Sequence, residues 1–248
     1  MKLELNHITK SFGENKVLND VTFALNEGSI TVLMGTNGSG KTTLFNIISG
    51  FLTLDNGEVL LDGKNISHET DYKINRLGVT RTFQDMRLIS NLTVKENLLL
   101  AFPSQYGEKW WRTIFPDKKI KEEQQVNSQK ADEILSTCFI DDITDSKAGE
   151  ISYGQQKLLN LACCMANDPQ ILLLDEPVAG VNPVFREKLA TVIRQMKDRG
   201  KTLMIIEHNT DFIETVADQI LFLNNGKIHS YESYRDFKND ENVKNAYV

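Results

Sequence analysis

Short apolar runs recur along the chain and alternate with longer segments whose apolar residues have a helical period. The runs within residues 30–34, 170–177 and 201–208 are nearly continuous, which is typical of strands buried on both faces of a parallel sheet. An amphipathic helix is expected at 183–200, where Gly200 provides a stop. Strands that alternate with helices in this way predict an α/β fold with a parallel sheet at its core.

Other stretches predict further strands, from alternating apolar and polar residues or from turn residues between two runs. A strand with alternating residues is expected at 2–12, and two strands around a turn at Glu27-Gly28 are expected within 20–35, the second being the buried run at 30–34. Hairpins with Asp-Gly and Asn-Gly turns are expected within 57–66 and 220–230. A short strand at 78–83 completes the set.

The middle of the chain has a different, helical composition. Helices are expected at 93–102 and 121–139, joined by an irregular link, and a further helix begins near Ser152. The link contains Pro103, Gly107, Trp110, Trp111 and Pro116. Because this block interrupts the strand–helix alternation, we expect an inserted helical subdomain at 93–166 within a single domain at 1–248. A second helical region is expected at 210–219, and a helical tail at 236–248.

Three glycines within six residues, then a lysine and two threonines, follow the first buried strand. Gly35, Gly40, Lys41 and Thr42 fill the phosphate-loop pattern G-x-x-x-x-G-K-[ST]. Glycines let bare backbone N–H groups approach phosphates, the lysine supplies charge to the β and γ oxygens, and the threonine hydroxyl binds Mg2+. The helix that follows points its positive end at the anion. The strand before the loop and the helix after it favour nucleotide binding over a chance Gly-rich turn.

Polar residues at the ends of strands are further candidates for chemistry. Asp175 and Glu176 follow a buried strand, at the edge where open α/β sheets place their ligands. Asp175 could hold Mg2+ and Glu176 could polarise an attacking water, although a solvated acidic turn has the same sequence. His208 could bond a γ-phosphate oxygen, or it could be satisfied by backbone. Gln84 could touch Mg2+ or the water, or be an ordinary loop amide.

Two further positions have both a functional and an ordinary interpretation. Ser152 and Gly154 begin a helix, which could be a second anion site or only a capped helix. Phe12 could stack on an adenine, or it could be a core aromatic residue.

The order of phosphate loop, glutamine, "ISYGQ", "ILLLDEP" and histidine resembles the ATP-binding-cassette ATPases over nearly the whole chain. That resemblance implies an α/β fold: a P-loop NTPase core with a mainly parallel sheet, an N-terminal antiparallel β subdomain and an inserted α-helical subdomain. It implies that Phe12 stacks on adenine, that Thr42, Gln84 and Asp175 ligate Mg2+, and that Glu176 is the catalytic base, assisted by His208 and Gln84. The implied nucleotide site comprises Phe12, Gly35, Thr36, Asn37, Gly38, Ser39, Gly40, Lys41, Thr42 and Thr43, with Ser152, Gly154 and Gln155 facing the ATP of an opposite subunit.

Longer stretches resemble one subgroup of that superfamily. "GVTRTFQDMRLISNLTVKENLLLAF", "SYGQQ", "EPVAGVNP" and "ENVKNAYV" are similar to the branched-chain amino-acid transport ATPases of the longer type, with urea-transport and lipopolysaccharide-export ATPases as near neighbours. Tyr153 stands where most of the superfamily has glycine. The resemblance implies ATP and Mg2+ as cofactors and membrane permease subunits as partners. It also implies a second ATPase, identical or paralogous, and a place on the cytoplasmic face of the membrane.

Composition argues against several other classes of protein. The chain has 248 residues, 40% hydrophobic and 25% charged, and its net charge of −6 argues against a general nucleic-acid surface. The first ten residues lack the apolar core of a signal peptide, and no apolar run approaches a membrane span, so we expect no direct membrane insertion. Cys138, Cys163 and Cys164 lack C-x-x-C spacing and are expected to be buried hydrophobes in a reducing cytosol.

Two rival functions share the phosphate loop. A soluble mechanical ATPase of the same superfamily often fuses two cassettes or carries long coiled coils, and this sequence contains neither. A small-molecule kinase would not need "ISYGQ" or the strand that ends in histidine, and it would need an acceptor pocket. We therefore expect a transport ATPase.

Overall fold

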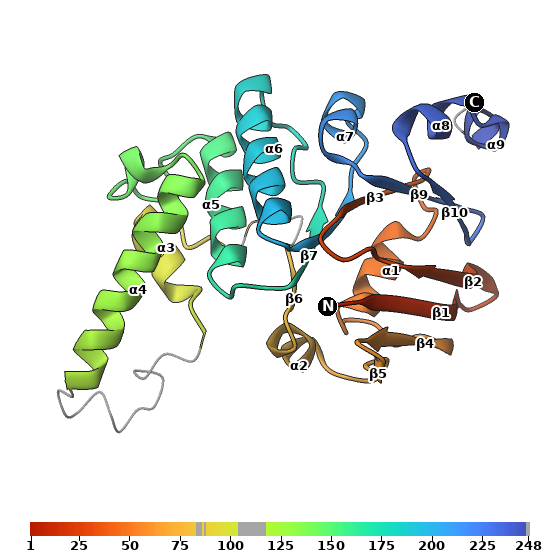
Figure 1. Cartoon of the computed structure of the whole chain (residues 1–248), viewed down its shortest axis with the longest axis horizontal. Coiled ribbons are helices and arrows are strands. Elements are labelled where there is room, and N and C mark those ends of the chain that lie inside the picture. The colour runs from red at the N-terminus through yellow and green to blue at the C-terminus, as the bar shows by residue number, and fades with distance from the viewer. Residues whose placement is uncertain (83–85, 87, 104–117, 247–248) are drawn as a thin grey trace. The chain divides into compact units, whose positions relative to one another are not determined.

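The structure is a computed structural model, which describes residues 1–82, 86, 88–103 and 118–246 (Figure 1). The chain divides into two compact units. The first comprises Met1–Gln84, Pro169–Gly180 and Ile193–Val248, and the second comprises Asp85–Asp168 and Val181–Val192. The predicted insert at 93–166 lies within the second unit.

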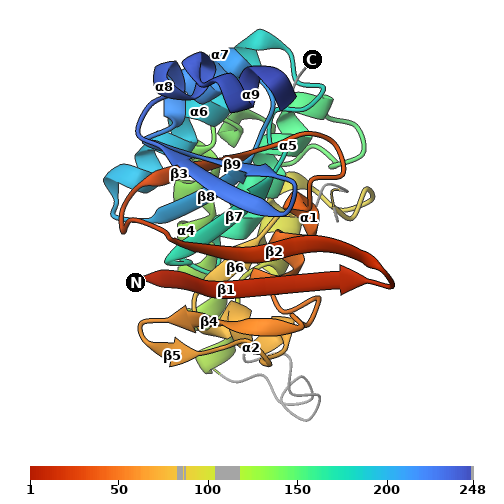
Figure 2. The same cartoon turned by 90° about the vertical axis from the view of Figure 1, so that its right-hand side faces the viewer.

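The first unit contains two sheets, of which the smaller is antiparallel (Figure 2). Its strand order is β2-β1-β4-β5. The strands are β1 (Leu3–Phe12), β2 (Asn15–Ala24), β4 (Asn56–Leu61) and β5 (Lys64–Asn65). The N-terminal strand and the hairpin within 57–66 are as predicted. The two strands expected within 20–35 lie in different sheets, because β2 begins at Asn15 and pairs with β1.

The larger sheet has the order β10-β9-β3-β8-β7-β6, and only its β9–β10 pair is antiparallel. Its strands are β3 (Ile30–Met34), β6 (Val79–Arg81), β7 (Ile171–Asp175), β8 (Thr202–Ile206), β9 (Gln219–Asn224) and β10 (Lys227–Tyr231). Every residue of β3, β7 and β8 is buried. The continuous apolar runs therefore form the central parallel strands, as predicted.

Helix α1 (Lys41–Ile48) contributes Leu44, Phe45, Ile47 and Ile48 to one apolar core with residues of both sheets. Burial of this face is what holds the helix start, and with it the phosphate loop, against the ends of the strands.

The remaining helices of the first unit are short. They are α2 (Asp71–Arg76), α7 (Thr210–Val216), α8 (Tyr234–Asn239) and α9 (Glu241–Ala246). The pattern does not predict α2, because only Ile74 of its six residues is buried. The helix predicted at 210–219 ends at Val216, because Ala217 takes an extended conformation on the way into β9. Within the tail, α8 begins at Tyr234, two residues before the predicted boundary at 236.

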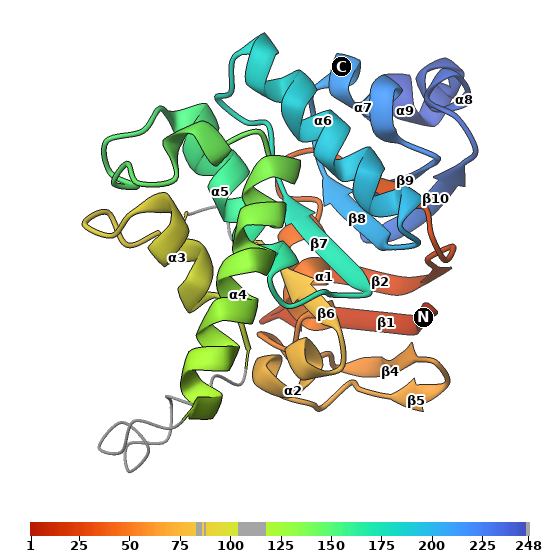
Figure 3. The ribbon, with the colours of Figure 1, turned by 60° about the vertical axis from the view of Figure 1, so that its left-hand side comes forward.

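The second unit is helical (Figure 3). It contains α3 (Val94–Leu100), α4 (Lys118–Thr137), a 3-10 turn (Asp141–Ile143), α5 (Tyr153–Met165) and the start of α6 (Pro183–Asp198). Helices α3, α4 and α5 pack on one another.

The three cysteines also lie in this helical unit, and all of them are free. Cys138 and Cys164 are buried, as expected, whereas Cys163 is half-buried. Burial raises the pKa of Cys163 to about 12, and burial with the neighbouring thiol does the same for Cys164. These thiols are therefore protonated at neutral pH and behave as small apolar groups.

In the described part of the chain, no helix combines the length and the hydropathy needed to cross a membrane. The predicted link residues Trp110 and Trp111, and Gln84, lie outside the described residues.

Candidate active site

The phosphate loop connects the end of β3 to the start of α1. Gly40 precedes the helix with a φ of 105°, in the region that favours glycine. A Cβ at Gly40 would lie 2.9 Å from Cγ1 of Val17. Both observations show why this position in the motif is glycine: any side chain would strain the turn and collide with β2.

The N-terminus of α1 is left open within the described structure. No side-chain cap hydrogen bond is present there, and the first intrahelical bond runs from Leu44 N–H to Gly40 O at 2.9 Å. The amides of the three residues before Leu44 therefore have no partner inside the helix. The hydroxyl of Ser39 is buried and has no hydrogen-bond partner among the described residues. Unpaired donors and a helix dipole at one point fit an anionic phosphate.

Lys41 supplies the positive charge of the loop. Its Nζ donates to Gly35 O at 2.8 Å and to Thr36 O at 2.9 Å, and the residue is only 8% exposed. Burial lowers the pKa of Lys41, while the carboxylates of Glu176 and Asp175 oppose that shift. The ammonium is thus held by loop carbonyls and by nearby carboxylates, in a place where phosphate oxygens would satisfy it.

Asp175 ends β7 and is paired with Arg81. The Arg81 Nη2–Asp175 Oδ2 distance is 2.9 Å, and the side chains are 7% and 9% exposed. Arg81 also donates to Asn46 Oδ1 at 2.6 Å, on α1. The Asp175 N–H donates to Thr82 Oγ1 at 3.1 Å. Arg81 therefore links β6, β7 and the helix that follows the phosphate loop.

Glu176 has an unusual backbone conformation for a residue with a side chain. Its φ is 47°, a left-handed value that costs of order 1–3 kcal/mol outside glycine. The Glu176 N–H donates to Ile206 O at 3.0 Å, which ties this strained residue to the end of β8. Its Oε1 lies 3.8 Å from Nε2 of His208, and the two side chains are 30% and 38% exposed. The surroundings thus hold a solvent-accessible carboxylate and an imidazole side by side.

Phe12 lies at the end of β1 and is 51% exposed, with Lys10 Nζ 5.7 Å from its ring centroid. The core interpretation of Phe12 is therefore wrong. An exposed aromatic face of this kind is suited to stacking on a base.

Ser152 and Gln155 cap α5 by themselves, in the second unit. The Gln155 N–H donates to Ser152 Oγ at 3.4 Å, and the Ser152 N–H donates to Gln155 Oε1 at 2.8 Å, which is a capping box. A Cβ on Gly154 would lie 2.5 Å from the ring of Phe185, so this glycine is needed for packing. Tyr153 is 46% exposed, and its ring carries Lys157 Nζ at 5.6 Å.

The first unit brings together Lys41, Asp175, Glu176 and His208, which the sequence places far apart. Thr42 is exposed at the start of α1. Two residues of this site were not predicted. Arg81 stands three positions before Gln84, and Glu207 stands directly before His208 at the end of an apolar strand. The feature of the sequence that could have identified both is a charged residue inside a buried strand or directly after one.

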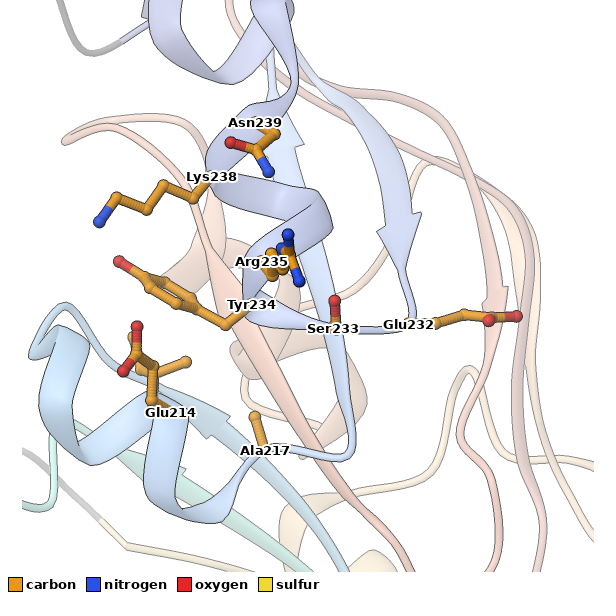
Figure 4. Close-up of a pocket in the computed structure, with 9 residues that line it drawn as sticks. Glu214, Ala217, Glu232, Ser233, Tyr234, Arg235, Lys238 and Asn239 are labelled. Carbon is orange, nitrogen blue, oxygen red and sulfur yellow. The ribbon is translucent and has the colours of Figure 1, made fainter.

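A cavity of about 490 Å³ lies elsewhere in the first unit, between α7 and α8 (Figure 4). Tyr234 and Lys238 lie on the side of α8 that faces Glu214 of α7, whereas Glu232 points away. Burial raises the pKa of Tyr234, and Glu214 adds to that shift. None of the residues lining this cavity belongs to the predicted nucleotide site.

Known proteins resemble this chain in both fold and sequence. A nucleotide-free ATP-binding cassette from an ABC transporter has a TM-score of 0.85 and 34% identity, with 100% of this chain and 99% of that chain covered. A cassette in its ADP conformation has the same TM-score and identity, with 100% and 98% covered. The fold is therefore that of the ABC ATPases, and the predicted fold class is confirmed.

The model of the ABC transporter family matches residues 18–179, well over half of the chain. A probable branched-chain amino acid transport ATP-binding protein LivG of Archaeoglobus fulgidus is 37% identical, covering 99% of this chain and 95% of the relative. The high-affinity branched-chain amino acid transport ATP-binding protein BraF of Pseudomonas aeruginosa is 32% identical, covering 99% and 97%. The chain belongs to the ABC transporter family. It is an ATP-hydrolysing, nucleotide-binding subunit of a transporter.

Proposed function

We propose that this chain powers the import of branched-chain amino acids, or of a similar small polar solute, from the cytoplasmic face of a membrane. The observation that carries the proposal is similarity along almost the entire chain to ATP-binding proteins named for branched-chain amino acid transport. Urea or lipopolysaccharide transport remains the alternative within the subgroup that the sequence resembles.

Residues of the loop and of the strand ends would bind the nucleotide. Lys41 and the open amides of α1 hold the phosphates, and Phe12 stacks on the adenine. Thr42, Gln84 and Asp175 would hold Mg2+; hydroxyl, amide and carboxylate oxygens are the donors that this hard cation takes, so the set fits it. When bound, the ion supplies positive charge to the β and γ oxygens. Arg81 orients the Asp175 carboxylate, because its guanidinium lies 2.9 Å from that group.

Glu176 and His208 would act on the attacking water. Glu176 accepts a hydrogen bond from the water and later its proton, while the neighbouring His208 donates to a γ-phosphate oxygen. The 3.8 Å separation between them leaves both side chains close enough to touch one water and one phosphate.

Partners would complete both the site and the transporter. Ser152, Gly154 and Gln155 of one subunit meet the ATP held by a second, identical or paralogous ATPase. Closure of the pair would move permease subunits, and hydrolysis would reset them. This arrangement separates the proposal from its rivals, because a kinase needs an acceptor and a soluble ATPase needs no permease.

Glu176→Gln is the first test. It keeps the shape of the side chain but removes its basicity, so hydrolysis without any acceptor should fall roughly 10²-fold or more. ATP binding should survive, and gel filtration with ATP, compared with ADP, should show an accumulated dimer.

Glu69→Gln is the matched control for that test, since it changes a carboxylate whose partner is Lys73 on the surface of the same unit. Wild-type turnover in Glu176→Gln would contradict the assignment of the base. A chain that binds ATP but stays monomeric would reject the self-paired form, and adding a paralogous ATPase would then decide whether the dimer is mixed.

Uptake by cells tests the solute. Cells that carry the wild-type chain with its permeases should take up leucine, isoleucine and valine, and cells with Lys41→Ala should not. Uptake of urea instead, or leucine uptake that Lys41→Ala leaves unchanged, would overturn the proposed solute.

A further inference from the structure

The carboxylate of Glu207 connects two loops of the site. Glu207 is only 3% exposed, and it accepts three backbone hydrogen bonds. Its Oε1 accepts the N–H of Val178 at 3.0 Å. Its Oε2 accepts the N–H groups of His208 at 2.7 Å and Asn209 at 3.0 Å. One side chain therefore holds the loop after β7 and the loop after β8 together.

Those two loops carry Glu176 and His208. Val178 stands two residues after Glu176, and the Ala179 N–H closes a turn back onto Glu176 O at 3.3 Å. On the other side, the amides of His208 itself and of the next residue are fixed. The backbone segments that carry the Glu176 and His208 side chains are thus joined through Glu207.

This arrangement is more than a way to satisfy a buried carboxylate. Hydrogen bonds from backbone to a charged acceptor are stronger than neutral ones, and their loss in a buried site leaves donors without partners. The left-handed backbone of Glu176 persists only if its surroundings impose it. The bond from Val178, two residues away, to Glu207 and the bond from Glu176 to Ile206 O are tertiary contacts that can do so.

We propose that Glu207 is a positioning residue for ATP hydrolysis, one that sets the Glu176–His208 geometry by tying Val178 to the backbone at His208. This rests on the proposed role of Glu176 and His208 in hydrolysis. Glu207 itself is buried and would not touch the nucleotide.

Glu207→Gln is the variant that tests the role. Glutamine has the same size, but its NH2 group can only donate, so at least one of the three backbone N–H groups loses its acceptor. We expect kcat for ATP hydrolysis by the full chain to fall roughly 10-fold to 100-fold, as small misplacement of catalytic groups does. KM for ATP should change by less than about twofold, because the phosphate loop is untouched. Hydrogen exchange at Val178, His208 or Asn209 should become faster.

Asp218→Asn is the matched control. Asp218 also accepts a backbone N–H, that of Ile30 at 2.8 Å, and it pairs with Lys197 at 2.5 Å, at the opposite end of β3 from the phosphate loop. It should lower thermal stability without lowering kcat. If both variants reduce kcat in proportion to their loss of stability, Glu207 is only a structural residue and the proposal is overturned.

A double-mutant comparison removes the remaining ambiguity. If Glu207 acts through the Glu176–His208 pair, Glu207→Gln should cost less than about twofold more in a His208→Ala background, because coupled residues are not additive. A full additional loss there contradicts the proposal. Should Glu207→Gln not fold, Glu207→Asp keeps the charge with a shorter reach and is judged by the same criteria.

The failure of this inference can be told apart from that of the proposed function. Wild-type chain that binds ATP but does not hydrolyse it would contradict the proposed function. Wild-type hydrolysis with an unchanged kcat in Glu207→Gln would contradict only the role of Glu207.

Discussion

Two helices of this protein begin in opposite ways. Helix α1 starts at Lys41, after a left-handed glycine, and no side chain caps it in the described structure. Helix α5 starts after Ser152, whose capping box with Gln155 engages the N–H groups of Ser152 and Gln155. Both starts are predicted to meet phosphate, but of the two only α5 carries a side-chain cap in the described structure.

The two helix starts would therefore contribute to an ATP site in different ways. Open amides and a buried lysine let α1 bind a nucleotide with groups of this chain alone. A capping box stabilises α5 without any ligand. The Ser152 hydroxyl also donates to Gln155 Oε1 at 2.8 Å, so its O–H must turn away from Gln155 before it can donate to a phosphate. We expect binding to depend on α1, and assembly with a second subunit to depend on α5.

Lys41→Ala should have the largest effect, because it removes the cation from the uncapped start of α1. ATP binding and turnover should both be abolished, since the ammonium is the main charge facing the β and γ phosphates. Nucleotide titration and a phosphate-release assay measure the two effects.

Lys197→Ala is the control for that variant, because Lys197 forms its ion pair with Asp218 away from the loop. Hydrolysis by Lys41→Ala near the wild-type rate would show that the loop is not the phosphate site.

Phe12→Ala tests the adenine end of the nucleotide whose phosphates the start of α1 is predicted to bind. Base–aromatic stacking is worth on the order of 1–3 kcal/mol, so ATP affinity should fall roughly 5-fold to 150-fold, with a smaller effect on the rate at saturation. Phe51→Ala changes another exposed phenylalanine of the same unit, 46% exposed, and should leave affinity unchanged. Equal affinities in folded Phe12→Ala and wild-type chains would remove Phe12 from the site.

The parts of this site that the sequence predicts are those encoded locally. Gly40 and Lys41 belong to one motif, and β3, β7 and β8 each consist of five buried residues in succession. A prediction from such segments needs no knowledge of what lies opposite them.

Arg81 and Glu207 could not be predicted, because their partners are distant in sequence. Asp175 is 94 residues from Arg81, and Val178 is 29 residues from Glu207. A pattern of apolar and polar positions shows a charged residue in or beside a buried strand, but only the folded sheet shows which group compensates it. Helix α2 was missed for a different reason, since one buried residue gives no period to detect.

The smallest effect is expected at the capped start of α5, and it is tested by comparing Ser152→Ala with Thr93→Ala. Thr93 caps α3 by the same kind of box, with its Oγ1 accepting the N–H of Glu96 at 3.1 Å, in the same unit as Ser152. Loss of either hydroxyl should cost about 0.5–2 kcal/mol of stability. In a chain of this size that corresponds to a fall in Tm of roughly 2–4 °C per kcal/mol.

The rate of ATP hydrolysis distinguishes the predicted roles of Ser152 and Thr93. If Ser152 leaves its box to meet the ATP of a second subunit, Ser152→Ala should slow hydrolysis and weaken the ATP-dependent dimer, whereas Thr93→Ala should change neither. ATPase rates, together with gel filtration of each variant in the Glu176→Gln background, decide the matter. Equal rates and equal dimer fractions in the two variants, at matched losses of Tm, would leave Ser152 as a helix cap and nothing more. The second half of the ATP site would then have to come from other residues.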